Sequence, residues 1–363
     1  MIIGIDITSL PGGRGPARYT TEIIRAMAKC PTSDDRFFLY SPFHKTILNL
    51  PDNFIQRVIP IKKTVPWLNW SLPRQIKRDK IEVMLFPAND FWLWPHTKTI
   101  VTILDVAQGT VLKDYKTRVS DRIQSFMQRK VISFTCESLI TISDYSAGQI
   151  TEHFKLKNKK PTVIHCGVSE IFKPSTNTAV KKDYILFVGG FDRRKNLERL
   201  LQAYKIIKHN KASEKLILAG SGGANKRLYY DIEELVKDAG LTEYVEIIKD
   251  PAETKLVELY NNAKLLVMPS LIEGFGLPVL EAMACGCPVV CSNVVSLPEV
   301  GGDAVRYFDP LDAADIARKV THLLNDAGLR LSLGNKGRDR AIRFSWDEAG
   351  ERTYQLLMEA SCR

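Results

Sequence analysis

Residues 265–299 read LLVMPSLIEGFGLPVLEAMACGCPVVCSNVVSLPE, and this stretch decides the fold. The apolar run Leu265–Met268 is typical of a buried strand, and a loop that contains two glycines follows it. Pro278 suits the first turn of a helix, where its missing N–H costs nothing, and Gly286 suits the residue just after the helix end. The run Pro288–Cys291 then predicts a second buried strand. Such a strand–loop–helix–strand unit is typical of a parallel α/β domain.

The loop before this helix is a candidate ligand site. Ligands of open parallel sheets bind beyond the carboxyl ends of the strands, and the free N–H groups at a helix start attract anions. Glu273 lies just before the helix and Glu281 lies within it, so both carboxylates can face a ligand at the helix start. Carboxylates suit sugar hydroxyls better than phosphate. The alternative is that Glu273 only caps the helix and that Glu281 is solvated.

The run EGFGLPVLE at 273–281, followed by EAMACGCPVV and SLPEVGGDA, resembles the Glu-x7-Glu signature of the retaining group 1 glycosyltransferases (glycosyltransferase family 4). The resemblance implies the GT-B fold and a nucleotide-diphosphate sugar as donor. It implies that Glu273 is catalytic and contacts the sugar hydroxyls, and that Glu281 binds the ribose. The backbone between them would bind the sugar and the distal phosphate, through Gly274, Phe275, Gly276 and Leu277.

A second loop, GGFDRRKN at 189–196, lies between an apolar strand expected over 184–188 and a helix expected over 197–207. Two cations at a helix start suit a diphosphate. The resembling family has Arg-Lys-Asn at this point, and its Arg-Lys pair binds the donor phosphates. The resemblance therefore gives Arg194 and Lys195 a catalytic role. The alternative is a surface turn with loose charges.

A weaker phosphate-binding pattern opens the chain. An apolar strand over residues 2–7 precedes the loop PGGRGP at 11–16, and a helix is expected from about residue 18 to 29. A glycine-rich loop between a strand and a helix can hold phosphate, although many such loops are plain turns. The resemblance aligns Gly15 with the glycine that approaches the nucleotide diphosphate, and it places Arg14 where a further glycine is common.

Asp105 is another candidate in the N-terminal half. It follows the apolar strand expected over residues 99–104, and acidic groups at the carboxyl ends of parallel strands are site candidates. The resembling family commonly has His-Asp here, whereas this chain has Leu104-Asp105. The resemblance thus implies a catalytic role for Asp105 near the donor or acceptor sugar. The alternative is that Asp105 caps the turn that follows it.

Strands and helices alternate at short spacing in both halves, which predicts two parallel sheets. We expect an α/β fold of two doubly wound, Rossmann-like domains that face each other across a cleft, the GT-B architecture of the resembling family. The N-terminal domain, 1–172, would bind the acceptor, and the C-terminal domain, 183–345, would bind the nucleotide sugar. A polar linker is expected at 173–182. The resemblance implies that a C-terminal helix, 346–363, joins the first domain.

The composition is that of a globular protein, with 363 residues of which 45% are hydrophobic. No apolar run approaches the roughly 18 residues that a membrane span needs, and the N-terminus lacks the basic segment of a signal peptide. The seven cysteines match no zinc pattern. These features predict a cytoplasmic location and reduced thiols.

The positive charge is concentrated in the first half, where residues 1–172 contain 24 basic and 15 acidic residues. Within it, Arg57–Lys80 mixes basic residues with Trp67 and Trp70. This pattern suits the surface of an anionic membrane. The alternative is that both tryptophans are core residues and that the charges line a solvated helix. Nucleic acid is not expected as a partner, because no nucleic-acid motif accompanies the stretch.

The resemblance implies a retaining transferase that moves a hexose, with GDP-mannose the favoured donor, to a hydroxyl of a glycan or lipid-linked acceptor. Surface polysaccharide synthesis, including that of lipopolysaccharide, would fit, with the protein peripheral on the inner membrane face. The chain contains no Asp-x-Asp motif, so we expect no metal and no other cofactor, and Arg194 and Lys195 would take the metal's place. The alternatives are a nucleotide-sugar epimerase, a phosphorylase or a non-catalytic nucleotide-binding module.

Overall fold

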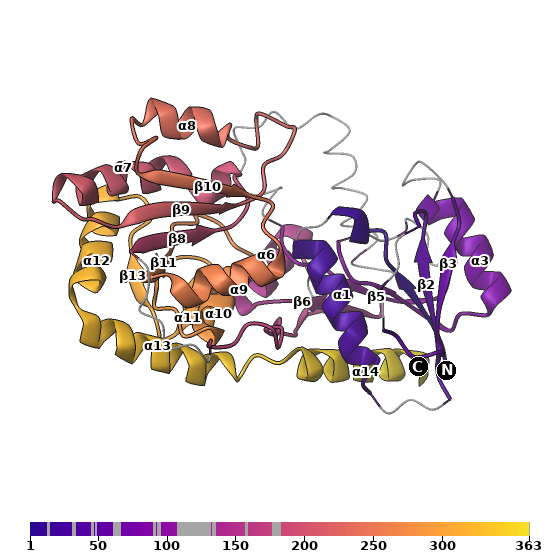
Figure 1. Cartoon of the computed structure of the whole chain (residues 1–363). Helices are drawn as coiled ribbons and strands as arrows, with labels where there is room; N and C mark the ends of the chain where they lie inside the picture. Colours follow the sequence, from indigo (N-terminus) through magenta and orange to yellow (C-terminus); the bar gives the residue numbers. More distant parts are fainter. Residues whose placement is uncertain are drawn as a thin grey trace. The chain divides into compact units, whose positions relative to one another are not determined.

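The chain forms two compact units in a computed structural model, unit 1 with Met1–Gly167 and Ser345–Arg363 and unit 2 with Val168–Phe344 (Figure 1). The described residues are 1–12, 15–30, 34–44, 47, 49–60, 67–89, 92, 96–106, 132, 136–156, 159–175 and 183–362. No helix in these ranges is both long enough and apolar enough to span a bilayer.

Unit 1 contains a parallel sheet with the strand order β3-β2-β1-β4-β5-β6-β7. The strands are β1 Ile2–Asp6, β2 Arg36–Ser41, β3 Phe54–Val58, β4 Val83–Phe86, β5 Lys98–Thr102, β6 Ser138–Thr141 and β7 Thr162–Val163. The described helices are α1 Gly15–Met27, α3 Leu72–Asp79, α6 Asp144–Phe154 and α14 Trp346–Cys362, with short turns η1 Leu10–Gly12 and η2 Trp67–Ser71. The strand order reverses at β1, as in Rossmann-like folds.

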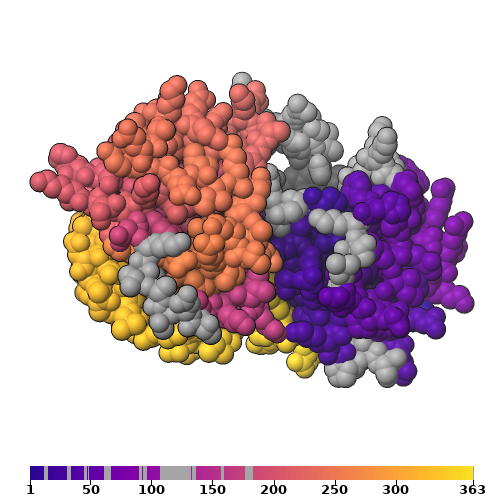
Figure 2. Space-filling model, in the orientation of Figure 1, coloured from indigo at the N-terminus to yellow at the C-terminus, as the bar shows by residue number. Residues whose placement is uncertain are grey.

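Unit 2 repeats this plan with the strand order β10-β9-β8-β11-β12-β13. The strands are β8 Tyr184–Val188, β9 Lys215–Gly220, β10 Val245–Lys249, β11 Leu265–Met268, β12 Val289–Ser292 and β13 Arg306–Phe308. The helices are α7 Leu197–His209, α8 Ile232–Asp238, α9 Glu253–Asn262, α10 Leu277–Ala284, α11 Leu297–Gly301, α12 Ala313–Asn325 and α13 Ala327–Ala341, with the turn η3 Arg193–Lys195. Figure 2 shows α12 and α13, in yellow, along one border of this unit.

Both central strands of unit 2 are buried along their whole length, since every residue of β8 and of β11 is buried. Parallel strands covered on both faces read as continuous apolar runs, which is why the sequence reveals them. The predicted fold class, two Rossmann-like α/β domains, is confirmed by the two parallel sheets. Strand β3 was not predicted, because its residues Phe54–Val58 are half-buried or exposed and form no apolar run.

The chain enters unit 2 at Val168, a few residues before the end of the predicted first domain at residue 172. The backbone N–H of Val168 donates to the carbonyl of Phe344 over 3.2 Å. The ring of Phe172 packs edge-on against Tyr260, with 5.9 Å between centroids. These contacts attach residues 168–172 to unit 2. Of the predicted linker, residues 176–182 lie outside the described part of the chain.

Helix α14 packs against α1 inside unit 1 (Figure 1). The ring of Trp346 meets Tyr19 edge-on at 5.8 Å between centroids. Further along the helix, Gly350 allows the backbone of α1 to approach closely at Ala26. An exposed ion pair of 2.8 Å joins Lys29 to Asp347 at the rim of this contact. The N- and C-terminal segments of the chain therefore share one hydrophobic interface.

The two tryptophans of the basic stretch Arg57–Lys80 have different environments. Trp67 is fully buried, and its indole Nε1 donates to the carboxylate of Asp6 over 3.4 Å. Trp70 is 55% exposed. The alternative in which both tryptophans are core residues is therefore wrong for Trp70, while Trp67 belongs to the core of unit 1. Residues 61–66 of this stretch lie outside the described residues.

Three cysteines between the end of α10 and the strand β12 are buried core residues. Cys285, Cys287 and Cys291 are each at most 3% exposed, and none of the three forms a disulfide with another described cysteine. Burial raises the pKa of the Cys291 thiol, so this thiol stays protonated at neutral pH. A buried, protonated thiol packs as a small apolar group and is chemically inert.

The close contact between α1 and α14 generates a stability prediction. In Gly350→Ala, the new Cβ would lie 2.5 Å from the Cβ of Ala26 and 2.7 Å from its carbonyl carbon. The helices must separate to accept it, so we expect destabilisation of about 1–3 kcal/mol. The measurement is urea unfolding of the full chain, monitored by circular dichroism.

The matched control is Gly148→Ala in the middle of α6, also in unit 1. An added Cβ there meets no atom within 4 Å. We expect this variant to gain about 0.5–1 kcal/mol, since alanine favours a helix more than glycine does. A Gly350→Ala variant that is as stable as Gly148→Ala would contradict the close packing of α1 and α14.

Candidate functional site

The two predicted loops of unit 2 follow neighbouring strands. Strand β8 pairs with β11 at the centre of the sheet, with β9 beyond β8 and β12 beyond β11. The strand order therefore reverses between β8 and β11, which is where open α/β sheets bind their ligands. The loop after β8 contains Lys195, and the loop after β11 contains Glu273. The fold thus brings together two segments that are 78 residues apart.

Lys195 and Glu273 form a buried ion pair. The Nζ of Lys195 donates to Oε1 of Glu273, and the two residues are only 8% and 9% exposed. The hydroxyl of Ser270 donates to the same carboxylate oxygen over 2.8 Å. The N-cap of α10 is Gly276, with no side-chain capping bond. The alternative in which Glu273 only caps the helix is therefore wrong, because Lys195 and Ser270 bind its carboxylate.

Backbone and side-chain hydrogen bonds join the two loops. The N–H of Leu271 donates to the carbonyl of Arg194 over 2.8 Å. The side-chain amide of Asn196 donates to the carbonyls of Pro269 and Pro310, over 3.1 and 2.8 Å. Asn196 has a positive φ of 59°, a conformation that asparagine tolerates better than most residues. These bonds fix the position of Lys195 relative to the end of β11.

The side chain of Ser296 binds the backbone of the loop that contains Glu273. The hydroxyl of Ser296, fully buried, lies 3.0 Å from the carbonyl oxygen of Glu273 and 3.0 Å from that of Phe275. Gly276 has a φ of 112°, and an added Cβ would lie 2.8 Å from the side chain of Leu297. The ring of Phe275 is buried and packs edge-on against Phe344, with 5.8 Å between centroids. The side chain of Phe275 therefore packs inside unit 2, and this residue can offer a ligand only its backbone groups.

Helix α10 presents its first turn at this loop and carries Glu281 in its second turn. Glu281 is only 2% exposed, and Tyr260 donates its hydroxyl to Oε2 over 2.9 Å. The alternative in which Glu281 is solvated is therefore wrong. Leu277 and Gly274 are half-buried at the helix start, where the first N–H groups of a helix have no partner within it.

Arg194 is held by its neighbour Asp192. The guanidinium Nε donates to Oδ1 of Asp192 over 2.9 Å, and the same carboxylate accepts the backbone N–H of Arg194. Asp192 is 7% exposed. Arg193 turns elsewhere and lies over the ring of Tyr230, 4.7 Å from its centroid. The alternative of loose surface charges is therefore wrong for this turn.

The two candidates of unit 1 lie at the carboxyl ends of its strands. Gly15 is the first residue of α1, and an added Cβ would meet no atom within 4 Å, so no described contact requires a glycine there. Arg14 lies outside the described residues. Asp105 follows β5 and is half-buried. Because each unit is described by itself, the roles of Gly15 and Asp105 remain predictions.

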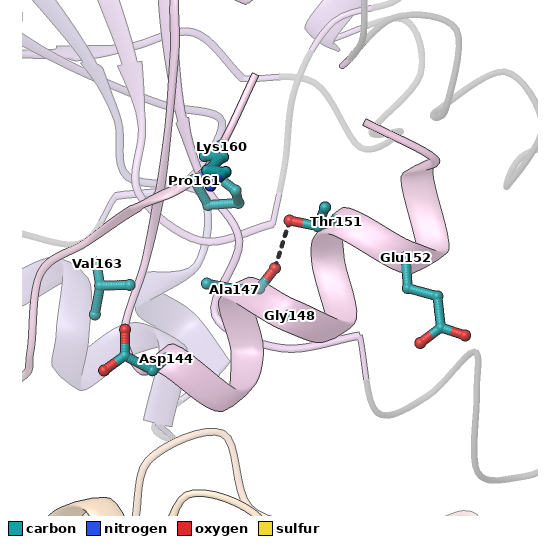
Figure 3. A pocket seen from close by; sticks show the side chains of 8 residues that line it. All are labelled: Asp144, Ala147, Gly148, Thr151, Glu152, Lys160, Pro161 and Val163. Atoms are coloured by element: carbon teal, nitrogen blue, oxygen red, sulfur yellow. Dashed lines mark hydrogen bonds between the residues drawn. The ribbon is translucent and has the colours of Figure 1, made fainter. Parts of the chain in front are cut away.

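A separate hollow of about 450 Å³ lies in unit 1, between α6 and the segment 160–163 (Figure 3). Its lining residues are Asp144, Ala147, Gly148, Thr151, Glu152, Lys160, Pro161 and Val163. The hydroxyl of Thr151 already donates to the carbonyl of Ala147 over 2.7 Å. None of the predicted site residues lines this hollow.

Several residues of the unit 2 site were missed by the sequence reasoning. They are Asp192, Asn196, Tyr260, Ser270 and Ser296. Asp192, Asn196 and Ser270 lie within the two predicted loops, so their polar side chains were a usable signal. Tyr260 belongs to α9 and reaches the site only through the tertiary fold, so no local pattern marks it. Ser296 opens the quoted run SLPEVGGDA, but its bonds to the Glu273 loop also form only in the tertiary fold.

A known sequence family matches the segment that contains these site residues. Residues 168–340 match the family described as Glycosyl transferases group 1. This part of the chain is similar to the group 1 glycosyl transferases. The resemblance predicted from EGFGLPVLE is therefore confirmed, and the matched span contains Lys195, Glu273 and Glu281.

Comparison with individual proteins supports the same family and fold. The chain is 34% identical over 233 residues to O-antigen chain mannosyltransferase B of Escherichia coli, a match that covers 60% of each protein. The chain thus spans about three fifths of the length of this relative.

Two solved structures align over nearly the whole chain. Sucrose-phosphate synthase from Thermosynechococcus elongatus has a TM-score of 0.77 at 21% identity, covering 99% of this chain and 98% of that one. Alr3699/HepE of Anabaena, in complex with UDP, has a TM-score of 0.73 at 15% identity and covers 99% of each. At these identities the likeness shows the fold alone, and it confirms the predicted GT-B class of two Rossmann-like domains.

Proposed function

We propose that the chain is a retaining glycosyltransferase that transfers a hexose from a nucleotide-diphosphate sugar to a hydroxyl of a glycan or lipid-linked acceptor. The buried pair of Lys195 and Glu273 at the β8/β11 strand reversal is the observation that carries this proposal. The family match of residues 168–340 supports it. GDP-mannose is the favoured donor and surface polysaccharide synthesis the favoured process, because a relative is an O-antigen chain mannosyltransferase.

In the proposed complex, the donor replaces the partners that Lys195 and Glu273 have in this structure. The distal phosphate accepts from Lys195 and Arg194, and the sugar hydroxyls donate to Glu273. A buried charge without a partner is costly, so the ion pair keeps both groups compensated until the donor arrives. The ribose hydroxyls donate to Glu281, and the backbone from Gly274 to Leu277 contacts the sugar and phosphate.

The same cations stabilise the leaving group. Negative charge develops on the distal phosphate as the glycosidic bond breaks, beside Lys195 and beside Arg194, whose guanidinium Asp192 holds in place. One pre-organised donor at such a position contributes roughly 3–4 kcal/mol to transition-state stabilisation. We propose that these cations make the reaction independent of a metal ion. Transfer on one face of the sugar, with a donor phosphate oxygen accepting the acceptor's proton, would retain the anomeric configuration.

The residues of unit 1 have proposed roles on the acceptor side and at the diphosphate. Gly15, at the start of α1, leaves room for the nucleotide diphosphate to approach the helix N–H groups. Asp105, after β5, would bind a hydroxyl of the donor or acceptor sugar. Both positions lie beyond the carboxyl ends of parallel strands, where ligands of such sheets bind.

Nucleotide binding tests the phosphate site. We expect one of GDP, UDP and ADP to raise the thermal midpoint of the wild-type chain, because a ligand that binds only the folded state stabilises it. Lys195→Ala removes the cation that binds the distal phosphate and should abolish this rise. The measurement is a thermal-shift titration with each nucleotide.

Lys255→Ala is the matched control, since Lys255 forms an exposed ion pair with Glu258 on α9. It should keep the wild-type response. A wild-type chain that responds to no nucleotide, or a Lys195→Ala variant that responds as the wild type does, would contradict the proposed donor site.

We further propose that α3 places the protein peripherally on an anionic membrane, on the inner face. One face of this segment carries Trp70, Arg74, Lys77 and Arg78, all exposed, while Leu72 and Ile76 on the opposite face are buried. The acidic residue of the helix, Asp79, already accepts from Tyr40 and pairs with Arg57. An exposed indole beside three cations suits the headgroup region of an anionic bilayer.

Vesicle sedimentation tests this surface. Each basic side chain near an anionic membrane contributes about 1 kcal/mol, so the double variant Arg74→Glu/Lys77→Glu should reduce binding to phosphatidylglycerol-containing vesicles at least about tenfold. Salt should weaken wild-type binding, and pure phosphatidylcholine vesicles should not bind.

The control is Lys205→Glu/Lys237→Glu, which changes the net charge equally through two exposed lysines of unit 2. It should bind vesicles as the wild type does. Equal loss of binding in both double variants would mean that net charge matters and that the α3 face does not.

A further inference from the structure

Glu281 has a carboxylate that is nearly removed from solvent. The residue is 2% exposed on the second turn of α10, and a buried ionised carboxylate needs hydrogen-bond donors. Tyr260 supplies one of them, since its hydroxyl lies 2.9 Å from Oε2. A hydrogen bond to an ionised acceptor is stronger than one between neutral groups. The tyrosine therefore restricts the direction in which the carboxylate points.

Tyr260 is itself held in place by its surroundings. Its ring is fully buried, and Phe172 packs edge-on against it with 5.9 Å between centroids. The hydroxyl of Tyr184, from β8, donates to the carbonyl of Leu259 over 2.8 Å and so ties the end of α9 to the central sheet. The packing of its ring and the anchoring of α9 therefore fix the position of the Tyr260 hydroxyl, and α10 fixes the backbone of Glu281.

We propose that Tyr260 is a positioning residue for nucleotide recognition: its hydrogen bond orients the carboxylate of Glu281 toward the ribose hydroxyls of the donor. This inference rests on the proposed function and names the residue that makes its ribose contact selective. A carboxylate has two oxygens and about four acceptor positions, so it can accept from Tyr260 and from ribose hydroxyls together. Tyr260 acts only through Glu281 and has no role in the bond that is broken.

A comparison of two nucleotides isolates this role. Isothermal titration would measure GDP and 2′,3′-dideoxy-GDP, with the UDP and ADP pairs measured in the same way. The wild type should prefer the nucleotide with ribose hydroxyls. Tyr260→Phe keeps the ring and removes the hydroxyl, so it should weaken the binding of GDP about tenfold and leave the binding of dideoxy-GDP nearly unchanged.

Tyr204→Phe is the matched control, because it removes a buried hydroxyl of unit 2 that bonds to the carbonyls of Glu214 and Tyr244 and not to α9 or α10. It should retain the wild-type preference between the two nucleotides. As a second measurement, Tyr260→Phe added to Glu281→Gln should cause no further loss of GDP affinity, since the two residues act as a unit.

Two results would overturn the inference while leaving the proposed function intact. Tyr260→Phe could bind GDP as tightly as the wild type, or it could lose the same factor for both nucleotides, which is the signature of a purely structural residue. A wild-type chain that binds none of the three nucleoside diphosphates would instead overturn the proposed function, and the inference with it.

Discussion

The buried ion pair between Lys195 and Glu273 is the interaction on which the site depends. It joins the loops after β8 and β11, at the reversal of strand order in unit 2. Because both groups are buried, either charge would raise the free energy of the folded state if it lacked a partner. Burial also strengthens the electrostatic attraction of each charge to a ligand that replaces its partner. The pair is therefore consistent with a site that accepts a ligand carrying both an anion and hydroxyl groups.

Hydrogen bonds from uncharged residues keep the pair in position. Asn196 ties the lysine loop to the end of β11, and Ser296 holds the backbone on both sides of Gly274. The hydroxyl of Ser270 donates to the carboxylate of Glu273, and that of Tyr260 donates to the carboxylate of Glu281. Such a supporting layer limits the movement of the binding groups, which is what electrostatic pre-organisation requires. The proposed function thus involves residues that need not touch a substrate.

Much of the fold could be predicted because central parallel strands are continuous apolar runs, as in Tyr184–Val188 and Leu265–Met268. The edge strand β3 could not, since its half-exposed residues Phe54–Val58 show no such run. Local spacing together with the family resemblance predicted Glu273 and Lys195 as site residues. Their ion pair, and the bond from Tyr260 to Glu281, arise from packing between elements distant in sequence, which no local pattern encodes.

The most direct test of the central claim is isothermal titration of GDP and GDP-mannose with the wild type and with Glu273→Gln. Glu273→Gln should lower the affinity for GDP-mannose relative to that for GDP, because only the sugar contacts this carboxylate. Affinity for GDP itself should be unchanged or higher, since the substitution removes the anion that competes for Lys195. An unchanged ratio between the two affinities would contradict the account.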